Sequence, residues 1–232
     1  MYGKSAILFC YIAIILLALV NTSNAQIPVY KYSFKTDFSI PVVTGSRAYR
    51  NTFSGVMSVN PAFNAHTPFG VYATAGFNYL QNKTANSKNF NLGVLEVKHH
   101  ILSPYAAVGY VYFNGGNFFW RADFSYRRSF GRFSRSLVPD SVAQEPQLTQ
   151  QFNEFAISSS ISFYSDEHLS FGFNVGYHLQ QYSFDPFPYY FDTVNNNTGK
   201  EDISNRNSFI TFGLGFTYHF APFKKQPIRE SK

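Results

Sequence analysis

The sequence contains one cysteine, Cys10, which lies in the apolar N-terminal stretch. We predict that export removes this stretch, so disulfides, thiol nucleophiles and cysteine-bound metals are excluded from the mature chain. Charged residues make up only 14% of the chain, which is fewer than a soluble domain normally carries. After residue 25 no apolar run reaches the roughly 18 residues that indicate a membrane-spanning helix. These shortages argue against disulfide-bonded proteins, ordinary soluble domains and helical membrane proteins.

The N-terminus has the three parts of an export signal. Lys4 gives the basic part, residues 7–20 give the apolar part, and Ser23-Asn24-Ala25 is a small-x-small cleavage site. The apolar part is shorter than the roughly 20 residues that a helix needs to cross a bilayer, which disfavours an uncleaved anchor. We therefore predict a signal peptide over residues 1–25 that is cleaved during export.

The C-terminal segment 208–220 alternates between two kinds of residue. The even positions are apolar: Ile210, Phe212, Leu214, Phe216, Tyr218 and Phe220. The odd positions from 211 are small or polar: Thr211, Gly213, Gly215, Thr217 and His219. Successive side chains of a strand point to opposite faces, so this strand has one apolar wall and one polar wall. A chain that repeats this pattern behind an export signal is predicted to be a transmembrane β-barrel.

Eight segments of barrel-strand length are predicted, at residues 30–40, 51–62, 71–81, 95–113, 117–130, 151–164, 169–182 and 208–220. Short turns alternate with longer polar loops at 42–50, 82–94, 131–150 and 183–206, as periplasmic turns and extracellular loops do in outer-membrane barrels. A rival partition splits 89–113 into two strands and leaves 42–69 as one loop. The predicted fold is all-β: a closed, antiparallel, up-and-down transmembrane β-barrel over residues 26–220, with both ends in the periplasm.

The motif Gly215-x-x-Tyr218-x-Phe220 is similar to the β-signal by which barrel strands are recognised for insertion. With its strand pattern, the chain resembles the small, often eight-stranded outer-membrane β-barrel proteins of the Bacteroidota type. The resemblance implies localisation in the cell outer membrane and contact with the barrel-assembly machinery during insertion. A β-signal usually ends the protein, whereas residues 221–232 follow here, and their composition predicts a disordered periplasmic tail.

Six charged residues fall on the predicted lumen side of two strands: Lys31, Lys35, Asp37, Arg121, Asp123 and Arg127. Side chains just fill the interior of an eight-stranded barrel, and isolated charges there are costly. We therefore predict that these residues pair in a structural network that closes the lumen, in preference to a diffusion pore. His178 and His219 share the lumen side, and we expect them to join this network rather than bind a metal.

Some small barrels are lipid-modifying enzymes, so catalysis needs a direct test. Those resembling lipid A deacylases use a His and a Ser on the outer face of a strand plus a carboxylate, and this chain offers His99, His100 and Ser103 with Glu96 nearby. His100 and Ser103 face opposite walls, and His99 and Ser103 are about 13 Å apart along a strand. That is too far to hydrogen-bond. The sequence predicts no enzyme, no catalytic residue, no cofactor and no metal site.

Basic residues gather where the fifth predicted strand meets its outer loop. Arg128, Arg132 and Arg135 are candidates for contact with lipopolysaccharide phosphates, because arginine offers planar, charge-assisted donors. Ordinary anchoring at headgroup level is an equally good interpretation. The net charge of +6 on an exported chain favours anionic lipid headgroups and not nucleic acid as the acidic partner.

The loop 183–206 is rich in aromatic residues: Phe184, Phe187, Tyr189, Tyr190 and Phe191. We predict that they form a lid over the barrel mouth, and a contact surface for a protein or sugar is the alternative. The function predicted for the chain is a non-enzymatic role in envelope structure or in an envelope complex with a protein partner. The alternative is a lipid-modifying barrel enzyme or a narrow outer-membrane pore.

Overall fold

The structure is a computed structural model, and it describes residues 30–84, 88–90, 93–113, 118–138, 148–166, 168–184 and 206–222. Its elements are β1 (Tyr30–Val43), α2 (Arg47–Thr52), β2 (Phe53–His66), β3 (Val71–Thr84), β4 (Lys88–Phe90), β5 (Gly93–Phe113), β6 (Phe118–Val138), β7 (Leu148–Tyr164), β8 (Leu169–Gln181) and β9 (Asn207–Pro222). Among the described residues, no helix has the length and apolar character needed to cross a membrane.

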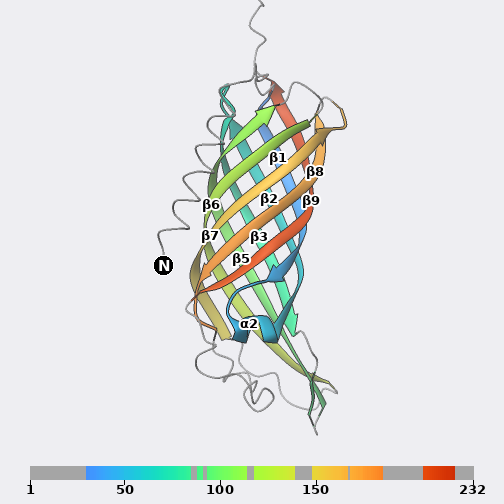
Figure 1. The fold of residues 1–232 in the computed structure, drawn as a ribbon, viewed down its shortest axis with the longest axis vertical. Helices are drawn as coiled ribbons and strands as arrows, with labels where there is room; N and C mark the ends of the chain where they lie inside the picture. The colour runs from blue at the N-terminus through green and yellow to red at the C-terminus, as the bar shows by residue number, and fades with distance from the viewer. Residues whose placement is uncertain are drawn as a thin grey trace, which may run out of the picture.

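Eight of these strands form a closed barrel (Figure 1). The sheet runs β3-β2-β1-β9-β8-β7-β6-β5, and a further antiparallel pairing of β3 with β5 closes it. The short β4 pairs only with the first residues of β5, from Lys88↔Leu95 to Phe90↔Gly93, and lengthens that strand's outer end. Closure matters because a bilayer offers no water to satisfy a free strand edge. The predicted fold, an eight-stranded antiparallel up-and-down barrel, is confirmed.

The two faces of β9 show how the sequence sets the walls. Phe212 is 53% exposed on the outside, whereas its neighbour Thr211 is 5% exposed inside. The same alternation places exposed Phe173 of β8 and Ile40 of β1 on the outer wall. An apolar outer wall on a closed barrel is the arrangement of an outer-membrane protein. The predicted parity of the last strand is therefore confirmed.

Several predicted boundaries need correction. The rival partition is wrong, because β2 lies within its proposed loop 42–69 and β5 is one continuous strand of 21 residues. β5 and β6 stay in register as far as Val94↔Val138, so part of the predicted loops 82–94 and 131–150 is strand. Two strands can stay hydrogen-bonded to each other beyond the membrane, in water. Polar residues in the sequence therefore do not show where such strands end. The last strand ends at Pro222, two residues beyond the predicted 220.

The first outer loop, predicted as an irregular polar segment at 42–50, contains the short helix α2. It lies at the end of the barrel opposite the turns that join β2 to β3 and β7 to β8 (Figure 1). The predicted signal peptide, and the predicted tail from residue 223 onward, lie outside the described residues.

Candidate functional site

Helix α2 is held across the loop end of the barrel by hydrogen bonds at its start. The hydroxyl of Ser46 accepts a bond from the backbone N–H of Tyr49 at 3.3 Å and donates to Oδ1 of Asn207 at 2.6 Å. Asn207 donates through Nδ2 to the carbonyl of Tyr182 at 3.0 Å. A six-residue helix is too short to be stable alone, so these contacts with the ends of β8 and β9 decide its position.

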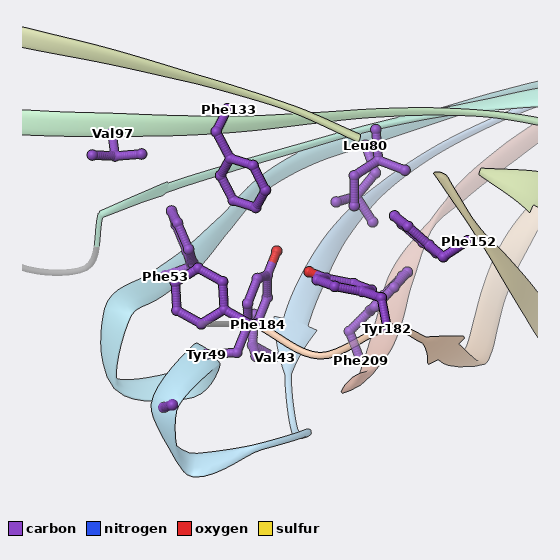
Figure 2. Packing of buried hydrophobic residues seen from close by; sticks show 12 residues of the cluster. Val43, Tyr49, Phe53, Leu80, Val97, Phe133, Phe152, Tyr182, Phe184 and Phe209 are labelled. Carbon is purple, nitrogen blue, oxygen red and sulfur yellow. The ribbon is translucent and has the colours of Figure 1, made fainter. Parts of the chain in front are cut away.

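A cluster of buried apolar residues, which we call the outer plug, fills the barrel beneath α2 (Figure 2). Its members are Val43, Ala48, Tyr49, Phe53, Leu80, Val97, Ile101, Phe133, Phe152, Tyr182, Phe184 and Phe209. The ring of Phe184 meets those of Tyr49 and Phe53 in edge arrangements, with centroids 5.3 and 5.4 Å apart. Such aromatic pairs stabilise a cluster beyond the area they bury. The outer plug closes this end of the lumen.

Two polar side chains, those of His99 and Asn82, are anchored inside the outer plug by the hydroxyl of Tyr49. Nδ1 of His99 lies 2.7 Å from the hydroxyl of Tyr49, which also accepts a hydrogen bond from Nδ2 of Asn82 at 2.8 Å. The imidazole stacks on the ring of Phe133, with centroids 3.8 Å apart. Tyr49 was not identified from the sequence, because nothing in a polar loop indicates that it turns into the barrel.

Halfway along the lumen, four polar groups contact the carboxylate of Glu154. It accepts hydrogen bonds from Gln180 at 2.9 Å and from the hydroxyl of Ser129 at 3.4 Å. It also lies 2.9 Å from Nδ1 of His178 and 3.5 Å from Nη1 of Arg127. Glu154 is fully buried, which is tolerable for a carboxylate only with such partners. We call Arg127, Glu154 and His178 the central ion cluster.

Glu154 was not singled out from the sequence, although a signal was present. It shares the lumen side of its strand with Ala156 and stands directly opposite Arg127 in the β6–β7 register. An inward carboxylate facing an inward arginine is the pairing that a closed lumen requires.

The other predicted lumen charges that line the interior are Lys35, Asp37, Arg121 and Asp123. Lys35 pairs with Asp37 at 2.8 Å. Asp123 accepts hydrogen bonds from the hydroxyls of Tyr72 and Ser158, at 2.9 and 2.6 Å. The buried guanidinium of Arg121 lies 4.9 Å from the centroid of the Phe119 ring, close enough for a cation–π contact.

The prediction for Lys31 differs from the structure, because its side chain is exposed although it has lumen parity. Lys31 is the second residue of β1, and a side chain at the end of a strand can reach water past the rim. Lys35, Arg121, Asp123 and Arg127 line one small cavity of about 10 Å³. A second cavity, of about 20 Å³, lies against Asp37 and His178. Since one water needs roughly 10–15 Å³, each of these two cavities has room for about one water.

The residues weighed for catalysis do not come together. His100 bonds to the hydroxyl of Tyr79 at 2.7 Å on the outer side of β5, while Ser103 is fully buried and bonds to Ser129 at 2.8 Å. The side chain of Glu96 lies outside the described residues. Among the described side chains, no group of three His, Cys, Asp or Glu residues could hold a metal ion.

Two of the predicted lipopolysaccharide contacts, Arg128 and Arg132, lie on the outer wall of β6. Arg128 and Arg132 are exposed, whereas the side chain of Arg135 is outside the described residues. Arg128 donates to Oδ1 of Asn153 at 2.8 Å and to Oε1 of Gln151 at 3.2 Å.

In the predicted lid, Phe184 is fully buried in the outer plug. The remaining aromatic residues of that loop lie outside the described part of the chain: Phe187, Tyr189, Tyr190 and Phe191. The insertion motif, Gly215, Tyr218 and Phe220, lies on β9, with Tyr218 52% exposed toward the outside.

Solved structures resemble this chain in its barrel fold. Neisserial surface protein A matches with a TM-score of 0.50 and 12% identity, over 82% of this chain and 97% of its own. The fold is that of an outer-membrane β-barrel. Ail, the attachment invasion locus protein of Yersinia pestis, matches with a TM-score of 0.45 and 10% identity, over 82% of this chain and 99% of its own. The outer membrane protease OmpT from Escherichia coli matches with a TM-score of 0.41 and 11% identity, over 87% and 100%.

No protein-family model matches the chain, and no curated protein matches it significantly by sequence. At these low identities the structural likeness concerns the fold alone.

Proposed function

We propose that this chain is a non-enzymatic outer-membrane barrel protein of the small Bacteroidota type, exported through a signal peptide cleaved after Ala25. Its role is structural or interactive: it acts through its outer wall and loop end, as part of the envelope or of an envelope protein complex. The observation that carries this proposal is the filled lumen. The outer plug closes the loop end, and the central ion cluster and its neighbours fill the middle.

A filled lumen limits what the protein can do. Transport would require the central ion cluster to separate, which leaves a buried charge without its partner at a cost of about 3–5 kcal/mol. Catalysis on lipid would require a nucleophile and a base on the outer face. The candidate nucleophile Ser103 instead points inward, and His99 is held by Tyr49 inside the outer plug. Surfaces outside the lumen are therefore the places where this protein meets its partners.

The experiment that tests the proposal has two parts. Mass spectrometry of lipid A from a deletion strain and its complemented parent should give the same acyl and phosphate pattern. Purification of the tagged full-length protein in mild detergent should retain a specific envelope protein. A lipid A change that wild type restores and Ser103→Ala does not would show an enzyme and overturn the proposal.

A further inference from the structure

Tyr49 occupies a place inside the outer plug that holds both its ring and its hydroxyl. The hydroxyl oxygen lies 2.7 Å from Nδ1 of His99 and accepts a hydrogen bond from Nδ2 of Asn82 at 2.8 Å. Three other rings surround that of Tyr49, with centroids between 4.9 and 6.1 Å away (Figure 2): Phe53, Tyr182 and Phe184. We call these five neighbours of Tyr49 the ring site. A mostly apolar enclosure with a few placed polar groups is the usual composition of a small-molecule site.

The two polar anchors of the ring site are not fully bonded. His99 is fully buried and Asn82 is 2% exposed. Tyr49 contacts one nitrogen of each, and Oδ1 of Asn82 has no hydrogen-bond partner in the part of the chain that the structure describes. A buried acceptor without a partner costs free energy, so a ligand has one more bond to gain here than Tyr49 makes.

Tyr49 belongs to a small element, whereas the other members of the ring site belong to the barrel. Helix α2 has six residues, which is too few for it to be stable alone. Its opposite side carries Arg47 and Arg50, which are exposed, so that side faces water. The remaining members lie on strands or shortly after one: Phe53 on β2, Asn82 on β3, His99 on β5, and Tyr182 and Phe184 after β8. The ring site can therefore persist when α2 moves.

The strands on either side of α2 leave it room to move. The pairing of β1 with β2 stops at Ser39↔Ser58, although β1 extends to Val43 and β2 begins at Phe53. Beyond that pair, β1 remains paired with β9 and β2 with β3. Helix α2 connects the two ends that are not paired with each other. It can swing outward without breaking strand pairing between β1 and β2, so it is a cover over the ring site.

We propose that the ring site binds a small molecule with a phenolic ring, and that Tyr49 occupies this site until the ligand replaces it. A phenol hydroxyl makes the same contacts with His99 and Asn82 as Tyr49 does, and its ring fills the same apolar space. Because Tyr49 competes, the apparent affinity is lowered to the fraction of molecules whose cover is out. The site goes beyond the proposed function, since it needs neither a protein partner nor an open lumen.

Isothermal titration of the full-length protein in neutral detergent tests the ring site with two probes, 4-methylphenol and toluene, which differ by one hydroxyl. Uptake by protein-free micelles is measured and subtracted. Tyr49→Ala should bind 4-methylphenol about tenfold or more tightly than wild type, because no internal ring competes. It should prefer 4-methylphenol to toluene about tenfold or more, because toluene leaves His99 and Asn82 without partners. Adding Asn82→Leu removes one anchor and should narrow that preference.

A reversible lock tests the displacement in protein that keeps Tyr49. The side chains of Ser46 and Asn207 touch at 2.6 Å, so Ser46→Cys with Asn207→Cys places two thiols where a disulfide would fix α2 to β9. The mature chain is predicted to contain no other cysteine. The oxidised form should bind 4-methylphenol about tenfold or more weakly than the reduced form, because its cover cannot leave.

Equal binding of 4-methylphenol by the oxidised and reduced forms would overturn the inference, and so would wild type that binds none. It would also fail if Tyr49→Ala, shown to be folded by its heat-modifiable migration, bound toluene as well as 4-methylphenol. A preference that Asn82→Leu left unchanged would reject the assigned anchors. If Tyr49→Ala does not fold, the lock and wild type decide the matter.

Discussion

The hydroxyl of Tyr49 lies 2.7 Å from Nδ1 of His99, across 50 positions of the chain. This bond joins a helix in the first outer loop to the inner face of β5. It gives the loop a fixed place inside the mouth of the barrel, where Phe53 and Phe184 pack on the same ring. The closed state of this barrel thus depends on a loop as much as on the strands.

Tyr49→Phe should lower the free energy of unfolding by about 1–3 kcal/mol, because it keeps the ring and leaves buried groups of His99 and Asn82 without their partner. Urea unfolding of protein refolded into vesicles measures the change. Tyr79→Phe is the control, since its bond to His100 is only part-buried and should cost less. An equal loss in the two variants would mean that the Tyr49 bond is not sheltered from water.

Glu154→Gln should destabilise the barrel by about 3–5 kcal/mol, because the guanidinium of Arg127 then lies buried without a negative partner. The double variant Glu154→Leu with Arg127→Met removes both charges and should recover most of that loss. The same urea unfolding measures both. If Glu154→Gln cost under about 1 kcal/mol, the interior would be hydrated and an open lumen would be favoured.

Phe212→Arg should cost roughly 2–4 kcal/mol, since it places a charge on the lipid-facing wall near the middle of the membrane. Phe212→Leu keeps the wall apolar and serves as the control. Thr211→Arg should also destabilise, because Thr211 is buried against His178 in a filled lumen. Heat-modifiable gel migration and thermal unfolding report these changes, and an unaffected Phe212→Arg would show that the wall assignment is wrong.

Asp166 gives the β7–β8 turn a dependence on pH. Its carboxylate accepts the backbone N–H groups of His168 and Leu169, both at 2.7 Å, and these bonds hold the pKa of Asp166 below its ordinary 3.8. A lowered pKa means that the carboxylate stabilises the fold above pH 3.8, and that this contribution is lost as the pH falls through the lower folded-state value.

Asp166→Ala should therefore lower the thermal midpoint at pH 7 and converge with wild type in strong acid. Asp166→Asn, which keeps an acceptor but no charge, should lie between them at pH 7. A constant difference between Asp166→Ala and wild type at every pH would contradict the assigned role of the charge.

Strand parity could be predicted from the sequence because a lipid-facing wall demands apolar residues at every second position, as in Phe212 and Leu214. The ends of β5 and β6 could not be predicted. Outside the membrane the outer wall no longer has to be apolar, and the two strands stay paired through polar residues. The position of Tyr49 could not be predicted either. It depends on contacts with β5 and β9, which local sequence does not reveal.

Planar-bilayer recording of the purified full-length protein tests the closed lumen most directly, with a general porin as the positive control. We expect no steady channel openings from wild type, because the outer plug and the central ion cluster fill the path. The account would be contradicted if wild type gave openings of one reproducible size and if Tyr49→Ala changed their conductance. That result would show that ions pass through this lumen.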